Sequence, residues 1–279
     1  MTRFTTTRPP RLNIDFRAGR IDITTEDVEE TTVELHGSSD EASQAVIADT
    51  VIDHRGDEIV VRVPKRAHGL FGRTPELQLD ITAPNGSRLN VKSDSGDLAA
   101  RGQVGESRIA TGSGDVSVEA LTGSAHVRSG SGDVNIGSAT DDLSVGTGSG
   151  DMHLGALGGS ASLASGSGDM TVESVAGGLK AETGSGDIEV GHAADDVRAK
   201  TGSGDVAVKH LSGGRLKAQT ASGDLHVGVA DGIPAWLDIN TLTGTVSNDL
   251  EATEPVGAQE EHVRLELKTV TGDIEIARA

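Results

Sequence analysis

A glycine-flanked aspartate recurs along this sequence every 18 residues, and this interval constrains the fold more than any other feature. The motif reads TGSGDVSV at 111–118 and TGSGDVAV at 201–208, with near copies between them. The aspartates spaced by 18 residues are Asp97, Asp115, Asp133, Asp151, Asp169, Asp187 and Asp205. Asp224 follows after 19 residues, Thr245 takes the equivalent place in TLTGTVS, and Asp273 closes the series. A fixed period of this length is typical of a solenoid, in which each repeat forms one coil.

Apolar and polar residues alternate twice within each repeat. Val116 and Val118 flank a serine after the aspartate, and Ile188 and Val190 flank a glutamate in a later copy. A second alternating segment begins ten residues after the aspartate, as at 125–127. Each coil is expected to hold two short β-strands, which pair in parallel with their copies in neighbouring coils and bury an apolar face. The sequence predicts an all-β fold, a parallel β-solenoid (β-helix) with 18-residue coils, and leaves its handedness open.

We expect one β-solenoid domain over the whole chain, residues 1–279. Residues 1–92 are expected to form irregular N-terminal coils and a cap, 93–230 the regular 18-residue repeats, and 231–279 the C-terminal coils and a cap. In the irregular part, AGRIDI at 18–23 resembles a degenerate SGD turn and strand. Both ends are expected to be covered, because the terminal strands of a solenoid expose unpaired edges.

Short sequence motifs predict the local structure near the two ends of the chain. Ser38 to Glu41 has capping-box spacing before ASQAVIADTV, which predicts one short N-terminal helix. EIVVRVP and ELQLDITAP are interpreted as strands ended by prolines, and PKRAHGLFGRTP between them as a basic loop. Near the C-terminus, an acidic loop from Glu251 to Glu261 precedes the last strand pair. Trp236 is interpreted as a cap or late-core residue in preference to a ligand-stacking residue.

Composition excludes several classes of function. The net charge of −19 disfavours nucleic acid and anionic membrane surfaces as partners. There is no cysteine for disulfides or thiolate metal sites, and with three phenylalanines, one tryptophan and no tyrosine the core must be thin. No stretch approaches 18 apolar residues, and the N-terminal MTRFTTTRPPRLNIDF has no apolar signal core. We therefore expect a soluble, cytoplasmic protein without a membrane span.

The repeated aspartates, which we call the aspartate ladder, are the first candidate site. In stacked coils they would lie about 4.8 Å apart, where two carboxylates repel by about 0.9 kcal/mol in water. Bound Ca²⁺ would offset this repulsion; the metal candidates are Asp115, Asp133, Asp151, Asp169, Asp187 and Asp205. Calcium-binding β-rolls, however, repeat an aspartate every nine residues. The favoured interpretation is structural: each aspartate accepts backbone amides in an Asx-type turn, and its flanking glycines take positive φ.

Other outward positions offer weaker candidates. His192 and His210 occupy equivalent places in adjacent coils, but two imidazoles make a poor metal site and solvated surface is favoured. A basic stripe follows the second strand of the coils, at Arg128, Lys180, Arg198, Lys200 and Lys217. It would attract an acidic partner or a second copy of the chain, although a charged row is usually solvated surface. No catalytic triad or phosphate-binding loop is distinguishable, which predicts a protein that is not an enzyme.

The motifs also carry a family resemblance over nearly the whole chain. The serial SGD turns, the lead-in ELQLDITAP…LNVKSDSGD and the ending AWLDINTLTGTVSNDL…HVRLELKTVTGDIEIARA resemble a bacterial family of candidate adhesins, domains of unknown function. The resemblance implies a β-solenoid and, in some members, a link to cell-envelope stress responses. It implies no catalytic residues.

We therefore predict a non-catalytic structural or interaction module without a cofactor, which binds a protein or cell-envelope partner or assembles with itself. The alternative is a Ca²⁺-dependent binding module that uses the aspartate ladder. A carbohydrate-active enzyme is a distant third, because such β-helices use aromatic platforms for sugars and this chain has almost no aromatic residues.

Overall fold

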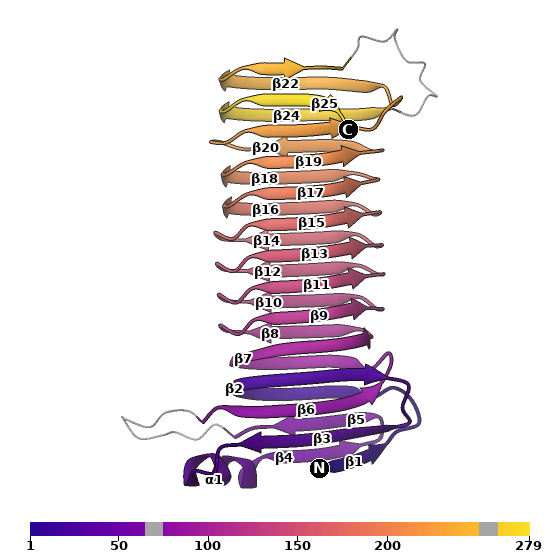
Figure 1. Cartoon of the computed structure of the whole chain (residues 1–279), viewed down its shortest axis with the longest axis vertical. Coiled ribbons are helices and arrows are strands. Elements are labelled where there is room, and N and C mark those ends of the chain that lie inside the picture. The colour runs from indigo at the N-terminus through magenta and orange to yellow at the C-terminus, as the bar shows by residue number, and fades with distance from the viewer. Residues whose placement is uncertain (65–74, 251–261) are drawn as a thin grey trace. The chain divides into compact units, whose positions relative to one another are not determined.

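The computed structural model of the protein describes residues 1–64, 75–250 and 262–279. The acidic loop, and the basic loop apart from its two end residues, lie outside the described residues. The chain divides into two compact units, Met1–Asp141 (unit 1) and Asp142–Ala279 (unit 2). Each unit is built from coils of two short strands that pair mainly in parallel, which confirms the predicted β-solenoid (Figure 1).

The regular part of unit 1 follows the 18-residue frame. Its strands are β7 (Arg88–Val104), β8 (Ser107–Thr111), β9 (Val116–Leu121), β10 (Ala125–Ser129) and β11 (Val134–Ala139). Val134 pairs with Val116, and Ile136 with Val118, so residues 18 apart lie side by side. The long strand β7 pairs with β8 through its first part and with β9 through its second. One continuous strand therefore supplies both sides of that coil.

The N-terminal end of unit 1 is folded out of sequence order. β2 (Arg11–Glu26) pairs along its length with β7, and Gly19 and Arg20 lie beside Gly96 and Asp97, as the degenerate repeat predicts. On its other side β2 pairs in parallel with β5 (Glu58–Arg62) and β6 (Leu77–Pro84). The antiparallel pairs β1–β3, β3–β6 and β4–β5 complete the cap, with β1 at Thr2–Thr5, β3 at Glu30–Gly37 and β4 at Val51–Arg55.

One short helix, α1 (Glu41–Asp49), forms where the sequence predicts it. Its N-cap is Asp40, however, and not Ser38: the backbone N–H of Ser43 donates to Asp40 Oδ1 at 2.9 Å. Hydrogen bonds from the hydroxyls of Ser38 and Ser43 hold the pKa of the Asp40 carboxyl well below its usual range. Ser38 thus supports the cap through Asp40 and does not itself form it.

Unit 2 repeats the two-strand coil more regularly. Its first strands are β12 (Leu143–Thr147), β13 (Met152–Leu157), β14 (Ala161–Ser165), β15 (Met170–Val175), β16 (Leu179–Ser185), β17 (Ile188–Ala193), β18 (Val197–Ser203), β19 (Val206–Leu211), β20 (Arg215–Gln219) and β21 (Leu225–Val229). The extra residue of the 19-residue interval lies in the turn before β20, so Leu216 pairs with Val197. Gly214 takes φ of +72° in this turn, where a side chain would be strained.

The C-terminal strands of unit 2 also leave the sequence order. β22 (Ala235–Thr243) and β23 (Val246–Asn248) precede β24 (Val263–Thr271) and β25 (Ile274–Arg278) in the chain. In space β24 lies between β20 and β22, and β25 lies between β21 and β23 (Figure 1). The last strand pair of the chain is therefore paired on both sides, and β22 and β23 form the outer coil.

The core of each unit is thin and mostly aliphatic, as the shortage of aromatic residues predicts. The alternating positions after each aspartate are buried, for example Val116 and Val118 in unit 1 and Met152 and Leu154 in unit 2. Phe16 on β2 is fully buried. Among the described residues, no helix has the length and apolar character needed to cross a membrane.

Candidate functional site

In unit 1 the aspartate ladder links consecutive coils through hydrogen bonds to the backbone. The N–H of Asp115 donates to Oδ1 of Asp97 at 3.0 Å, and the N–H of Asp133 donates to Oδ1 of Asp115 at 2.9 Å. Arg20 lies in register with Asp97 on β2, and its guanidinium contacts Asp22 at 2.6 Å. On the N-terminal side of Asp97, which is the first rung of the ladder, the equivalent position therefore holds a cation and not another carboxylate.

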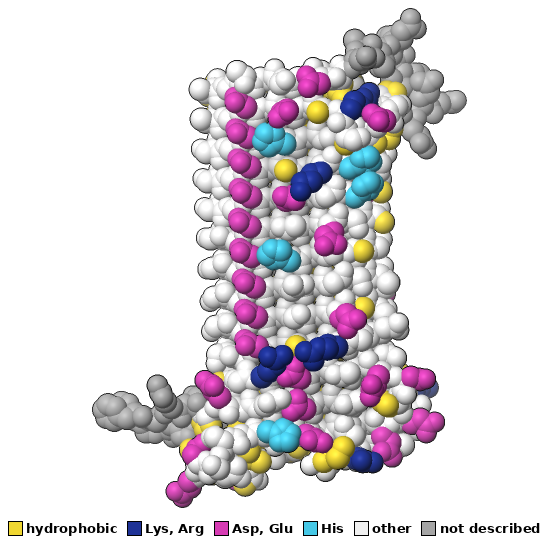
Figure 2. All heavy atoms as spheres, in the orientation of Figure 1, with side chains coloured by type: hydrophobic (Ala, Val, Ile, Leu, Met, Phe, Trp, Pro, Cys, Tyr) yellow, Lys and Arg dark blue, Asp and Glu magenta, His cyan; other side chains and the backbone are white. Residues whose placement is uncertain are grey.

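The same bond recurs in unit 2, where acidic side chains line up one above another (Figure 2). In each case the backbone N–H of the first residue donates to Oδ1 of the second: Asp169 to Asp151 (2.9 Å), Asp187 to Asp169 (2.8 Å), Asp205 to Asp187 (2.8 Å), Asp224 to Asp205 (2.7 Å), Asp273 to Asp224 (2.7 Å) and Thr245 to Asp273 (2.7 Å). The favoured prediction of backbone hydrogen bonding is correct in kind, but the donor belongs to the neighbouring coil and not to the turn of the aspartate itself.

The order of the last rungs differs from the sequence order. Asp273 accepts from Thr245 and donates to Asp224, so it lies between them, and Thr245 occupies the end of the ladder. Asp273 closes the series in sequence but not in space, because β24 and β25 lie beneath the outer coil. Hydrogen bonds from the backbone and side chain of Thr245 lower the pKa of the Asp273 carboxyl.

The glycine before each aspartate is required by the close approach of the coils. A Cβ added to Gly114 would lie 2.1 Å from the carbonyl oxygen of Gly96, and one added to Gly168 would lie 2.0 Å from that of Gly150. The expected positive φ occurs in the later turns of unit 2, at Gly186 (155°), Gly204 (145°) and Gly223 (149°). In the earlier turns of both units, contact with the preceding coil and not φ excludes a side chain.

The serine or threonine at the start of each turn has two roles. In the earlier turns its hydroxyl accepts the glycine N–H three residues later, as Thr111 does from Gly114 at 3.0 Å. From Thr183 onward the hydroxyl donates to a glycine carbonyl of the preceding coil, as Thr201 does to Gly186 at 3.0 Å. These later turns are the ones in which the glycine φ is positive. The hydroxyl of each turn is therefore bonded either within its own turn or to the preceding coil.

The ladder does not gather ligands as a closed metal site does. At Asp169, Asp187 and Asp205, Oδ1 accepts a backbone amide of the next coil, which leaves Oδ2 as the free oxygen. Calcium takes six to eight oxygen ligands. Within the described residues no group of three or more His, Cys, Asp or Glu side chains is arranged to hold a metal ion. Calcium binding at the six candidate aspartates stays a prediction.

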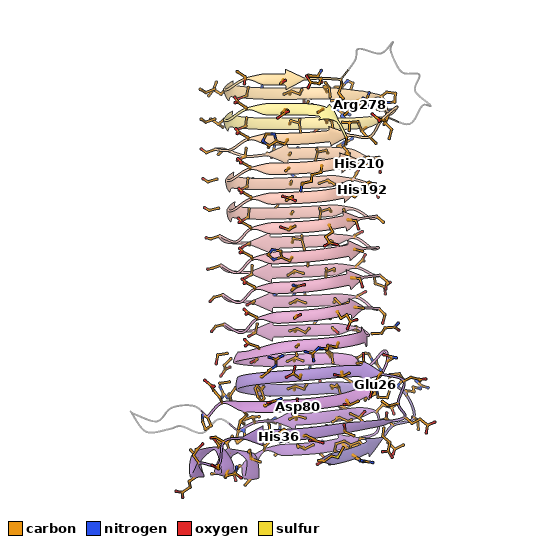
Figure 3. The ribbon with its side chains drawn as sticks, viewed as in Figure 1. Glu26, His36, Asp80, His192, His210 and Arg278 are labelled. Carbon is orange, nitrogen blue, oxygen red and sulfur yellow. The ribbon has the colours of Figure 1, made fainter. Side chains whose placement is uncertain are left out.

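The histidine pair lies where the repeat predicts. His192 on β17 pairs in register with His210 on β19, and their rings stack with centroids 4.1 Å apart and an interplanar angle of 20° (Figure 3). In the preceding coil Ser174 occupies the same position. The two imidazoles have no third ligand among the described side chains, so stacking is the interaction that this pair forms.

Four members of the basic stripe, all but Arg128, lie in unit 2 on neighbouring strands. Arg198 pairs in register with Lys180 on one side and Lys217 on the other, and Lys200 lies two residues along. Lys180 contacts Glu182 at 2.9 Å, and Lys217 lies 3.8 Å from a glutamate of β24. Among the described residues neither Arg198 nor Lys200 has an ion-pair partner. Arg128 lies in unit 1 on β10.

The outer coil of unit 2 carries Trp236 on its outward face. The side chain is 46% exposed, and the guanidinium of Arg264 lies 4.2 Å from its ring centroid. Of the two interpretations of Trp236, the cap residue is correct and the late-core residue is wrong, because the alternation of β22 turns its neighbours Ala235 and Leu237 inward instead. It belongs to the end coil and forms a cation–π contact there.

Sequence reasoning missed a second group of basic residues, in unit 1. Arg11, Arg88, Arg108 and His126 line one pocket on the outward face of β2, β7, β8 and β10. The repeat frame contained a signal for two of them. Arg108 and His126 stand eleven residues after Asp97 and Asp115, the position that Lys180 and Arg198 hold in later coils. Arg11 and Arg88 precede the regular repeats and had no such frame.

Three comparisons with known proteins bear on the family. A family model described as Toastrack DUF4097 matches residues 10–276 of this chain, which confirms the resemblance of the sequence to a family of unknown function. No curated protein matches the sequence.

Solved structures show a weak likeness along the whole chain. A candidate adhesin from Bacteroides fragilis is 14% identical, with 100% of this chain and 95% of that chain covered and a TM-score of 0.49. A candidate adhesin from Parabacteroides distasonis is 12% identical, with 98% and 95% covered and a TM-score of 0.39. Because these TM-scores are below 0.5, neither likeness carries an argument about function.

Proposed function

Because this chain belongs to the Toastrack family of domains (DUF4097), we propose that it is a non-catalytic interaction module that binds an acidic protein surface. The part of the basic stripe in unit 2 is the binding surface, and its parallel strands hold the cations in fixed register. A cytoplasmic location, association with the cell envelope and self-assembly stay predictions.

The observation that carries this proposal is a set of unpaired cations in a strongly acidic chain. The net charge is −19, yet Arg198 and Lys200 lack an ion-pair partner within the described ranges. Lys180, Arg198 and Lys200 also act on a neighbouring carboxyl. The pKa of Glu182 is lowered, first by its hydrogen bond with Lys180 and then by the charges of all three cations. The surface around Glu182 is therefore locally positive.

Strand geometry makes this surface suitable for a protein partner. In-register parallel strands repeat about every 4.8 Å, so the cations form an ordered row on a rigid sheet. Binding to such a row requires little ordering of the backbone. Charge complementarity then favours partners with clustered Asp and Glu and disfavours basic ones.

A labelled poly-glutamate peptide tests the proposal directly. We expect fluorescence anisotropy to show saturable binding at low salt that weakens as salt rises, because the contacts are exposed ion pairs. The double variant R198Q/K200Q should weaken binding by about tenfold. The double variant R88Q/R108Q in unit 1 removes the same net charge and serves as the matched control. Absence of binding to the wild type, or equal loss in both variants, would overturn the proposal.

The second candidate is a calcium-dependent form of the same module. It is favoured by the free Oδ2 atoms of Asp169, Asp187 and Asp205, which follow one another on consecutive coils. Neighbouring rungs about 4.8 Å apart offer a bridging ion two carboxylate oxygens, far fewer than calcium prefers. Such a ladder holds cations loosely, so this candidate ranks second. Melting experiments with sodium, calcium and EDTA separate the calcium-dependent module from the basic-stripe module.

A further inference from the structure

A pocket in unit 1 concentrates arginine side chains. It has a volume of about 340 Å³ and opens on the outward face of β2, β7, β8 and β10. Its charged and polar lining includes Arg11, Arg88, Asn90, Glu106, Arg108 and His126. Three arginines against one glutamate leave two positive charges in the lining. Its volume is at the lower end of the range for small-molecule sites.

Strand register brings these cations together. Arg11 on β2 is the direct neighbour of Arg88 on β7, and Arg108 on β8 is the direct neighbour of both Asn90 and His126. Direct neighbours in parallel strands are about 4.8 Å apart, and like charges at such positions destabilise the pairing. The Arg11–Arg88 pair therefore costs stability unless an anion offsets its charge.

The protein supplies only part of that negative charge, from Glu106 in the lining and Glu58 beside Arg11. In the described part of the chain, none of the three pocket arginines forms an ion pair or a side-chain hydrogen bond. Glu58, the neighbour of Arg11 on β5, accepts a hydrogen bond from the side chain of Asn13 and is not ion-paired with Arg11, so it offsets the charge of Arg11 only from a distance. The pKa of His126 is lowered, first by burial and then by Arg128 and Arg108, which agrees with an uncompensated positive field.

From this arrangement we infer that the pocket binds a small molecule bearing a phosphate monoester, with the phosphate held by Arg11, Arg88 and Arg108. Guanidinium groups match phosphate oxygens with two parallel hydrogen bonds, which suits them to a doubly charged oxyanion. Asn90 and His126 contribute hydrogen-bonding groups for the remainder of the ligand. The site lies in unit 1 and does not depend on the proposed role of the basic stripe.

The negative net charge of the whole chain favours a small anionic ligand over a long one. A net charge of −19 repels long polyanions such as nucleic acid. At physiological salt the screening length is about 8 Å, so a small anion inside the pocket responds mainly to the nearby arginines. A sugar phosphate therefore fits both the local charge and the pocket volume.

Glucose 6-phosphate is the probe for this site, and glucose is its neutral control. We expect NMR titration of the full chain to give saturable shifts at residues 88–90, 107–109 and 125–127 with the phosphate and none with glucose. R88Q/R108Q should weaken binding by about tenfold or more. R198Q/K200Q, which has the same net charge, should leave it within about twofold, because its substitutions lie in unit 2.

Further variants separate binding from folding. If R88Q/R108Q lowers the melting temperature, the variant R108K separates binding from folding. Arg108 is exposed, and lysine keeps the positive charge but lacks the planar guanidinium group. We expect R108K to bind several-fold more weakly with an unchanged melt. Vesicles with phosphatidic acid test a lipid source of the same phosphate; their capture in preference to glucose 6-phosphate would overturn the small-molecule assignment. Absence of saturable shifts in the wild type, or equal weakening by both double variants, would overturn the site itself.

Discussion

Within each unit, aspartates of the ladder use one carboxylate oxygen to accept a backbone amide of the neighbouring coil. Asp187 shows both halves of this role: its N–H donates to Asp169, and its Oδ1 accepts the N–H of Asp205 at 2.8 Å. The acceptor needs the oxygen and not the charge. A residue that keeps the oxygen but loses the charge therefore separates the structural role from an ionic one.

Substitution at Asp187 tests this distinction. Asp187→Ala leaves the N–H of Asp205 without its partner and should lower the free energy of unfolding by about 1 kcal/mol. Asp187→Asn retains an oxygen acceptor and removes one carboxylate from the row, so its stability should match the wild type within a few tenths of a kcal/mol. Urea unfolding of both variants measures the difference. Equal destabilisation by Asn and Ala would show that the charge itself is needed.

Asp273 adds a pH dependence at the end of the ladder. Thr245 lowers the pKa of its carboxyl in the folded state. The stabilising effect of the carboxylate is therefore complete above the unfolded pKa of about 4 and is lost as the pH falls through the lower folded value. Between neutral pH and a pH of about 2.5, the melting temperature of the wild type should fall further than that of Asp273→Asn, which cannot titrate. Parallel pH profiles would contradict this prediction.

At the scale of elements, the repeat predicts what the regular coils do and misses how the ends are closed. Alternation about each aspartate identifies which residues are buried, because a strand period of two and a fixed interval determine both face and partner. It even identifies 18–23 as a degenerate repeat, which pairs beside Gly96 and Asp97. The spatial order of β22 to β25 was not predictable, since sequence similarity between repeats does not specify which coil lies beside which.

The repeat also predicts some of the candidate functional groups and misses others. The ladder and the His192–His210 pair follow from the 18-residue frame, because equivalent residues of adjacent coils must lie side by side. The pocket of unit 1 combines Arg108, which lies within the frame, with Arg11 and Arg88, which precede it. Their proximity depends on the pairing of β2 with β7, a contact between segments about 77 residues apart.

In unit 2 the strands β24 and β25 form an inserted pair beneath the outer coil, so the strands nearest the C-terminus should not be the first to fray. β24 is paired on both sides and β22 on one, although β24 is nearer the chain end. Amides of residues 263–278 should therefore exchange with deuterium more slowly than those of residues 235–248. Leu267→Ala, at a fully buried position, should cost about 2–4 kcal/mol and increase exchange in both coils.

Ile239→Ala is the matched control for this experiment, since Ile239 on β22 is half-exposed. It should cost less and increase exchange mainly in the outer coil, because β24 keeps its pairing with β20 when β22 loosens. Faster exchange at 263–278 than at 235–248 in the wild type would show that the outer coil and not the inserted pair is the more stable element.

At the scale of the whole molecule, electrostatic repulsion opposes the fold. The net charge is −19, and within each unit the ladder places consecutive carboxylates one after another on the surface. Such self-repulsion is screened by salt, because the Debye length falls from about 30 Å at 0.01 M to about 8 Å at 0.15 M. A melting temperature that rises with salt is therefore expected whether or not the ladder binds a specific ion.

Ion specificity then decides between the two candidate functions. Sodium chloride should raise the melting temperature by several degrees, because its ions screen the repulsion between the carboxylates. Calcium chloride at matched ionic strength should raise it by the same amount, because the ladder does not coordinate calcium. EDTA should leave the melt unchanged. The triple variant D169N/D187N/D205N keeps the oxygen acceptors and removes three charges, so it should melt higher at low salt and respond less to added salt. A much larger rise with calcium, abolished both by EDTA and by the triple variant, would instead establish the ladder as a calcium site and favour the calcium-dependent module over the basic stripe.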